Sequence, residues 1–191
     1  MSRAEQFVEV AEKYFEVRFK ESQEKIYRDF EKRRTEVYQN LVNVIYEGIA
    51  QCQQMSKKVK YIIISILESS TITKSYDLQV AFYDEKIYAD DTPVYVYWKP
   101  MLAFSKLEED MAFFKQKVSE KEVRVKDYEM DIIREKYLIN HYFFILLFLL
   151  QIVPGLFAND KQCSSITNDF QVMFGRYMEK TILIYQSGET T

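Results

Sequence analysis

The sequence predicts a mainly α protein, in which long antiparallel helices enclose a small β-hairpin insert. Three observations support this fold class. Only four glycines and three prolines occur among 191 residues, which leaves few positions for turns and helix breaks. Residues 4–54 contain no proline and a single glycine, and residues 102–153 carry an apolar residue at almost every seventh position. Helices with such a repeat usually pack lengthwise on another helix.

Length, composition and charge indicate a single ordered domain and limit the expected partners. The length suits a single domain over residues 1–191. Hydrophobic residues make up 48% of the chain and aromatic residues 16%, which is too much apolar surface for a disordered protein. A net charge of -3 and a pI near 5.4 predict no general attraction to nucleic acid, so DNA is not an expected partner and RNA would need a local patch.

The two cysteines, Cys52 and Cys163, lie far apart and have no ligand-like neighbours, so neither a metal site nor a cofactor is predicted. The N-terminus has no continuous apolar segment and is not a secretory signal. These features favour the cytoplasm.

The first element is one long helix, or two nearly collinear helices, over residues 4–54. Its apolar residues follow the three-and-four spacing of a helix face, at Ile26, Phe30, Val37, Leu41, Val44 and Ile45. The opposite face carries charges of both signs, which is typical of a solvated surface.

The second element is the hairpin insert at 59–100. "YDLQVAFYD" and "VYVYW" alternate between apolar and polar residues, and "ADDTP" between them has turn chemistry. "YIIISIL" before them is either a short buried helix or a strand. Trp98 and nearby tyrosines form either an exposed platform for bases or half-buried packing, and the second interpretation is favoured.

The third element is a long helix over 102–153, and the fourth is a C-terminal helix over 165–186 capped by Ser165. The seven-residue repeat of the third consists of Phe104, Met111, Val118, Val125, Ile132 and Ile139. Its partner is either the first helix, in an antiparallel hairpin, or a second copy of the chain. We therefore expect a homo-oligomer.

Three polar residues on the third helix are either the candidate catalytic site or structural residues, with Arg134 paired to an acidic neighbour (Asp127, Asp131 or Glu135) and His141 partly buried. Arg134 and His141, the sole histidine, are seven residues apart, so they project from one side of the helix about 10 Å apart. Asn140 lies beside the histidine. A histidine titrates near neutral pH and a guanidinium binds phosphate in a fork, so the two side chains are suited to proton transfer and to phosphate binding.

The segment "REKYLINH" at 134–141 resembles the Arg-x(4–6)-His motif of the HEPN superfamily, whose members are helical and are in many cases metal-independent ribonucleases. The resemblance implies a HEPN-like helical bundle in which His141 transfers the proton, Arg134 holds the phosphate and Asn140 orients the pair, with two chains meeting at the site. The chain is also similar to small HEPN-like accessory proteins encoded beside type VI-B CRISPR RNA-targeting effectors. That similarity implies a homo-oligomer that enhances antiphage defence with the effector, as a membrane-associated pore.

From 137 to 157 the chain has no Asp, Glu, Lys or Arg, and about 20 predominantly apolar residues can span a bilayer. Asn140, His141, Gln151 and the Pro154-Gly155 pair interrupt the run, which favours a buried core helix. The expected location is the cytoplasm or the inner membrane of a bacterium.

Phosphate-binding glycine loops, GxSxG and HExxH are absent from the sequence. The features above are compatible with three functions, in order of preference: an oligomeric accessory protein of RNA-targeting immunity, a dimeric HEPN ribonuclease, and a cytosolic scaffold without catalytic activity.

Overall fold

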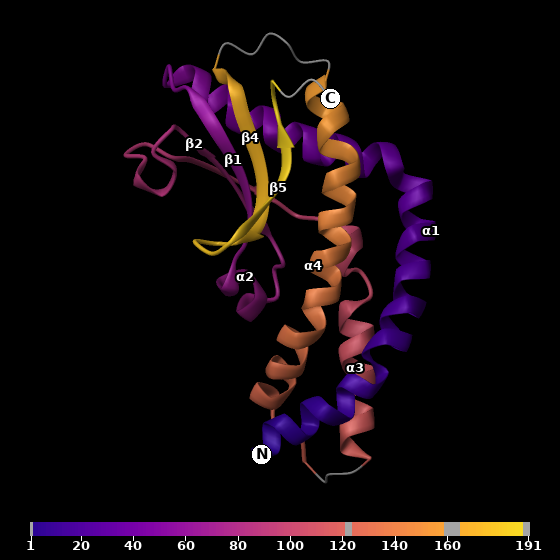
Figure 1. Cartoon of the computed structure of the whole chain (residues 1–191). Helices are drawn as coiled ribbons and strands as arrows, with labels where there is room; N and C mark the ends of the chain where they lie inside the picture. Colours follow the sequence, from indigo (N-terminus) through magenta and orange to yellow (C-terminus); the bar gives the residue numbers. More distant parts are fainter. Residues whose placement is uncertain (1, 121–123, 159–164, 189–191) are drawn as a thin grey trace. The chain divides into compact units, whose positions relative to one another are not determined.

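The computed structural model describes residues 2–120, 124–158 and 165–188. Within these residues the chain is α+β, because it combines long helices with a five-stranded sheet that has both parallel and antiparallel pairs (Figure 1). The predicted mainly α bundle with a small hairpin is therefore wrong. The helix predicted over 4–54 is present as α1 (Arg3–Gln54).

Two compact units divide the chain. The helical unit contains residues 1–34 and 101–145, and the sheet unit contains residues 35–100 and 146–191. Arg33 has non-helical φ and ψ angles of -118° and 19°, so α1 is interrupted close to the division. The prediction of a single domain stays a prediction.

In the helical unit, the first part of α1 packs with η2 (Met101–Phe104), α3 (Leu107–Ser119) and the first part of α4 (Asp127–Ala158). Contacts of Lys25 with Glu109 and of Tyr14 with Phe113 make α1 and α3 antiparallel. Phe15 meets Tyr137 and Phe19 meets His141, so α1 and α4 are parallel, which the predicted antiparallel arrangement did not include.

The single helix predicted over 102–153 is also wrong, because α3 ends at Ser119 and α4 begins at Asp127. The start of α4 has a local cause. Glu129 accepts a hydrogen bond from the Lys126 backbone N–H at 2.8 Å, as in a capping box, and acidic residues in the first turn favour a helix N-terminus.

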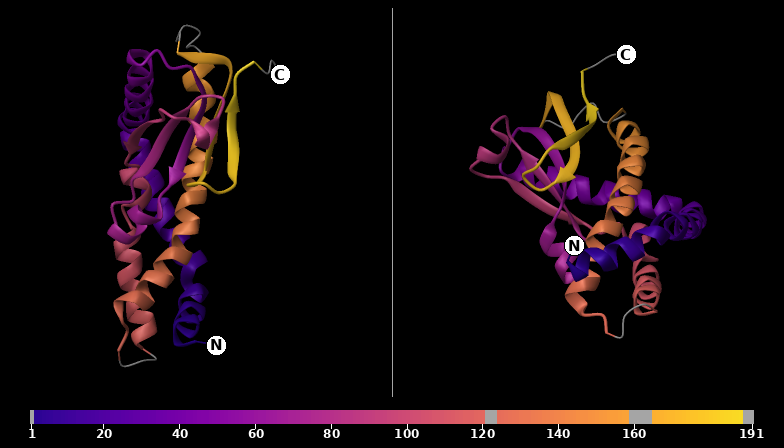
Figure 2. Two further views of the ribbon diagram at one scale, coloured as in Figure 1. Left: turned by 90° about the vertical axis from the view of Figure 1, so that its left-hand side faces the viewer. Right: turned by 60° about the horizontal axis from the view of Figure 1, so that its bottom comes forward.

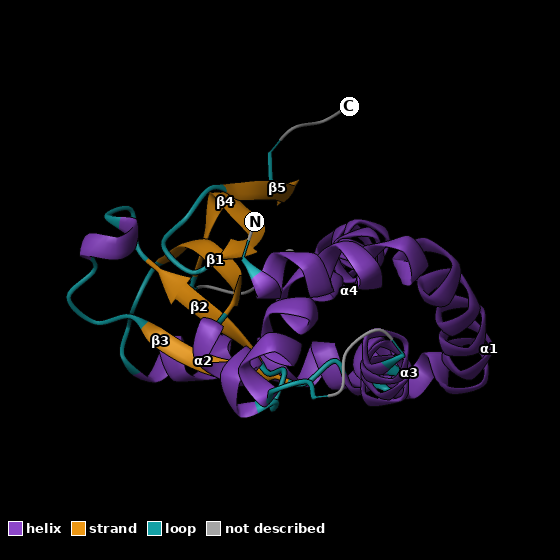
Figure 3. Cartoon of the chain, turned by 90° about the horizontal axis from the view of Figure 1, so that it is seen from below, coloured by secondary structure: helices purple, strands orange, loops and turns teal. Residues whose placement is uncertain are grey.

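The sheet unit orders its strands β3-β2-β1-β4-β5. The strands are β1 (Val59–Ile66), β2 (Leu78–Tyr83), β3 (Val94–Trp98), β4 (Ile166–Arg176) and β5 (Thr181–Gln186), and short helices α2 (Glu68–Thr73) and η1 (Ile87–Ala89) connect the first three. The central pair β1 and β4 is parallel and the other pairs are antiparallel. Strands and helices are distinguished by colour in Figure 3, and β5 forms the outer edge of the sheet in the left view of Figure 2.

The helix predicted over 165–186 is replaced by β4 and β5. Phe170, Val172 and Phe174 are buried at alternate positions, which is strand periodicity. Ser165 caps no helix; its carbonyl accepts a hydrogen bond from Val59 N–H at 2.7 Å. The β4 segment also contains apolar residues at helical spacing, so pairing with β1 decides its structure.

Helical residues of the same unit cover one face of the sheet. Phe148 and Phe157 of α4 contact Trp98 and Phe170 at ring-centroid distances of 6.1 and 4.9 Å. On α1, a Cβ at Gly48 would lie 2.0 Å from Cε2 of Phe82. Glycine is required at this position because a residue with a Cβ would clash with the Phe82 ring, and α1 could not lie so close to β2.

Candidate functional site

Arg134 lies in the helical unit, on α4, and is 5% exposed. Its guanidinium binds both carboxylate oxygens of Glu108 on α3, with Nη2 to Oε2 at 3.1 Å and a second contact from Nη1 to Oε1. A forked pair of this kind uses the same geometry by which arginine binds phosphate. In this structure the fork of Arg134 therefore joins α4 to α3.

His141 is completely buried, with 0% exposure. Its Nδ1 lies 2.7 Å from the carbonyl oxygen of Ala103 in η2. The rings of Phe19, Phe104 and Tyr137 surround the imidazole at centroid distances of 5.2, 5.7 and 5.3 Å. Burial lowers the pKa of His141, and the Ala103 carbonyl and Asp110 oppose that shift only in part. Burial among these aromatic rings therefore favours the neutral form of the imidazole.

Asn140 is half-buried and lines a groove on the surface of the helical unit. Consecutive helix residues point about 100° apart, so the amide faces the groove while the His141 ring faces the core. Arg134 and His141 both meet the η2 and α3 segment, as two residues on one side of a helix would. The three predicted site residues thus have three separate environments.

Sequence reasoning missed a second polar group in the same unit. Asp110 of α3 is 0% exposed and accepts hydrogen bonds from Arg18 Nε at 2.7 Å, Ser22 Oγ at 2.8 Å and Tyr137 OH at 2.8 Å. Burial, followed by the neighbouring carboxylate, raises the pKa of Tyr137. Ser22 offered one signal, because it occupies an apolar position in the spacing of Phe19 and Ile26.

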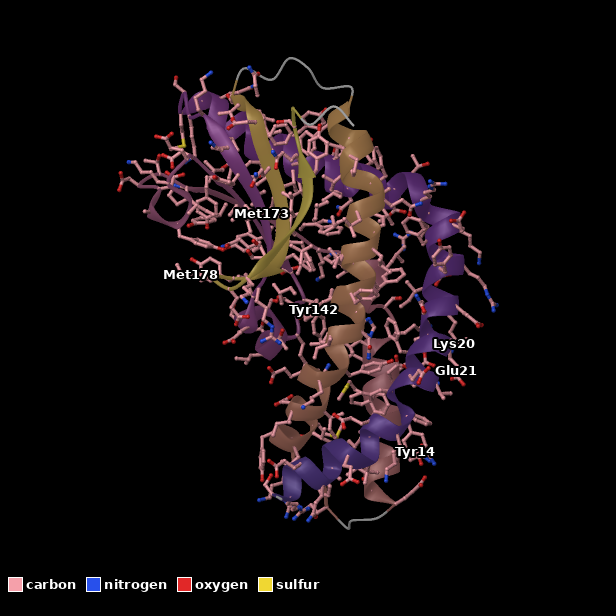
Figure 4. The ribbon with its side chains drawn as sticks, viewed as in Figure 1. Tyr14, Lys20, Glu21, Tyr142, Met173 and Met178 are labelled. Carbon is pink, nitrogen blue, oxygen red and sulfur yellow. The ribbon has the colours of Figure 1, made fainter. Side chains whose placement is uncertain are left out.

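The groove that Asn140 lines has a volume of about 710 Å³ and lies between α1 and α4. Both helices contribute polar and apolar side chains to its lining. The lining residues are Glu12, Phe15, Glu16, Phe19, Lys20 and Gln23 from α1 and Lys136, Ile139 and Asn140 from α4. Figure 4 shows Lys20 among the side chains of α1.

The acidic turn of the sheet unit has a structural role. Asp90 forms a buried ion pair with Lys57 and accepts backbone hydrogen bonds from Asp84 and Thr92, both at 2.9 Å. Burial alone would raise the pKa of Asp90, but Lys57 and the two amides hold it below its ordinary value. Within the residues that the structure describes, no group of three or more potential ligands could hold a metal.

The aromatic residues of the insert divide between the two faces of the sheet. Trp98 is 1% exposed and packs on α4, whereas Tyr95 and Tyr97, at alternate positions of β3, are exposed. Trp98 is therefore fully buried packing, whereas Tyr95 and Tyr97 are exposed. Cys52 is buried and free, and Cys163 lies outside the described residues.

One helix in the described part of the chain, α4 from Asp127 to Phe157, is long and apolar enough to cross a membrane by length and composition. In the structure only 33% of its most apolar stretch is buried. Exposed residues of its helical-unit part include Tyr128, Ile132, Ile139 and Phe143, and these four share one side of the helix because they are spaced by three to four residues or multiples of that spacing.

Comparison with family models, with curated proteins and with solved structures finds no match for this chain.

Proposed function

We propose that this protein is a non-catalytic interaction protein that works as a homo-oligomer, and that the exposed apolar side of α4 takes part in self-association. The observation that carries the proposal is the exposure of Ile139 and Phe143, at 57% and 59%, on a long helix. Large apolar residues gathered on one side of a helix mark an interaction surface, whereas scattered ones need no explanation.

The environments of Arg134 and His141 support the absence of chemistry. A general base must reach the proton that it abstracts, yet the imidazole of His141 is enclosed by three rings and bound to a backbone carbonyl. Arg134 already uses its fork to bind Glu108. Both side chains stabilise the packing of α4 on the η2 and α3 segment.

The connectivity of the sheet supports contact of the exposed side of α4 with protein and not with the lipid of a bilayer. β1 precedes α4 in the chain and β4 follows it, and these strands pair in parallel at Ile62 with Val172 and at Ile64 with Phe174. A helix that crossed a membrane between them would put the two strands on opposite sides. The intact sheet favours α4 in water, with its exposed side covered by protein.

The sequence resemblance supplies a biological setting for the proposal, an accessory role beside a type VI-B RNA-targeting effector of bacterial immunity. Only the segment from Arg134 to His141 supports this setting, because the helical bundle that came with it is wrong. Phage protection by such an effector, measured with and without this chain, tests it. Protection that is unchanged by the chain would exclude the accessory role.

The substitution Phe143→Asp tests self-association. A charged residue on a contact surface opposes its burial, so we expect the native molecular mass, measured by light scattering, to fall toward that of one chain. Ile72→Asp is the matched control, because Ile72 is exposed on α2 in the other unit. An unchanged mass for Phe143→Asp would exclude this side of α4 from the contact.

The absence of catalysis has its own test. Purified protein incubated with single-stranded RNA should leave the RNA intact, with and without added effector. RNA cleavage by the wild-type chain that disappears in both Arg134→Lys and His141→Phe would contradict the proposal and restore a ribonuclease function.

A further inference from the structure

The groove of the helical unit has two unlike walls. Because Phe15 contacts Tyr137 at a centroid distance of 5.1 Å and α1 runs parallel to α4, Glu16 and Lys136 lie at about the same height on opposite walls. Glu12 and Glu16 make this part of the α1 wall acidic, while Lys136 makes the facing part of the α4 wall basic. All three side chains are exposed.

Each wall also carries apolar side chains. Phe15 and Phe19 are half-buried on the α1 wall, and Ile139 with the neighbouring Phe143 is exposed on the α4 wall. Farther along α1, Lys20 lies level with the uncharged part of α4 because Phe19 contacts His141. Each wall therefore complements the other in charge and can cover it with apolar surface.

We infer that the groove is a self-complementary interface, in which a second copy of this chain docks about a two-fold axis that runs along the groove. Such an axis places α1 of each copy over α4 of the other, as a closed dimer requires. Glu12 and Glu16 then meet the second copy's Lys136, while Ile139 and Phe143 cover the second copy's Phe15 and Phe19. This inference rests on the proposed function and adds the partner's face and orientation to it.

Charge reversal tests this geometry. In Glu16→Lys the reversed residue would face Lys136 of the second copy, and in Lys136→Glu it would face Glu16, so each variant alone brings like charges together twice in the dimer. Because like charges at an interface oppose association strongly, we expect self-association of each variant to weaken by at least about tenfold. Glu31→Lys, the same change at an exposed position of α1 outside the groove lining, should behave as the wild type.

Mixing the two variants separates contacts between copies from contacts within one chain. In a mixed dimer the lysine introduced at position 16 of one chain faces the glutamate introduced at position 136 of the other. The unchanged Lys136 of the first chain faces the unchanged Glu16 of the second, so both contacts join opposite charges. With one variant carrying an affinity tag, we expect equimolar mixing to restore the dimer as a heterodimer of tagged and untagged chains. An ion pair within one chain cannot be restored in this way.

The outcomes are distinct. A heterodimer formed by the mixture, with weakened association of each variant alone, supports the interface. A wild-type oligomer that neither charge reversal affects overturns the interface and leaves the proposed oligomer in place on another surface. Two weakened variants whose mixture stays monomeric overturn the two-fold arrangement. A wild-type chain that is monomeric in the same assay overturns the interface and the proposed function together.

Discussion

Each unit is stabilised internally by a buried carboxylate with specific partners. Asp110 of the helical unit accepts hydrogen bonds from three different residues, and Asp90 of the sheet unit is bound by Lys57 and two backbone amides. A buried carboxylate is tolerated only when it is paired and hydrogen-bonded. Removal of one partner therefore costs more than the same change at the surface.

The Lys57→Met variant tests this at Asp90. It leaves the carboxylate buried without a cation, so we expect a loss of about 3 to 5 kcal/mol in the free energy of unfolding, measured with urea. Lys99→Met, at an exposed position close to the sheet, should change the free energy by less than about 0.5 kcal/mol. Equal losses in the two variants would mean that the ion pair contributes little.

His141 makes the helical unit sensitive to acid. Burial lowers the pKa of the folded-state imidazole, so its contribution to stability is complete above the unfolded pKa of about 6.5. The contribution is lost as the pH falls from there toward the folded pKa, by up to about 1.4 kcal/mol per pH unit. Thermal unfolding followed at about pH 7.5 and about pH 5.5 should show a lower midpoint in acid.

His141→Phe is the control for this prediction, because it keeps an aromatic ring in the cage and removes the titrating group. Its midpoint should change less between the two pH values than that of the wild type. The same change in both proteins would assign the acid sensitivity to groups other than His141.

Among the helices and strands, those whose secondary structure follows from a local apolar pattern could be predicted from the sequence. The helix over 4–54 has a long apolar face and no proline, and it is present as α1. The alternating stretches before Trp98 are strands β2 and β3, and the β-branched run before them is strand β1.

The wrongly predicted elements are those whose secondary structure depends on contacts with residues distant in sequence. The seven-residue repeat continues through Val125, yet Glu129 caps a new helix after it. Val118 and Met111 are buried in the helical unit, whereas Ile132 and Ile139 of the same repeat are exposed. The segment after Ser165 is compatible with either helix or strand, and its pairing with β1 is a contact across about a hundred residues of sequence. Local periodicity contains no such information.

In the candidate site, too, local geometry could be predicted from the sequence but contacts with other elements could not. The spacing of Arg134 and His141 on one side of a helix could be predicted, because it depends on helix geometry alone. Their partners, Glu108 and the Ala103 carbonyl, belong to another element. Burial of the histidine therefore could not be read from the sequence.

The two helical glycines provide a matched test of packing between elements. Alanine at Gly48 would place a Cβ 2.0 Å from the Phe82 ring, whereas nothing lies within 4 Å of a Cβ at Gly155. Gly155→Ala should raise the free energy of unfolding by about 0.5 to 1 kcal/mol through helix propensity. Gly48→Ala should lower it by about 1 to 3 kcal/mol through overpacking, and stabilisation by both would contradict the contact with Phe82.

At the scale of the whole molecule, the helical unit interrupts the sheet unit in sequence, and α1 and α4 each belong to both units. The parallel pair of β1 and β4 forms only after the intervening residues have been made. α4 therefore has two roles. Its buried side completes the core of each unit, and its exposed apolar residues remain available to a second chain.

The central claim is that the chain associates with itself through the helical unit. Sedimentation velocity of the wild-type protein over a range of concentrations tests it most directly. We expect a dimer or a larger closed oligomer that dissociates on dilution. A single species with the mass of one 23.0 kDa chain at every concentration would contradict it.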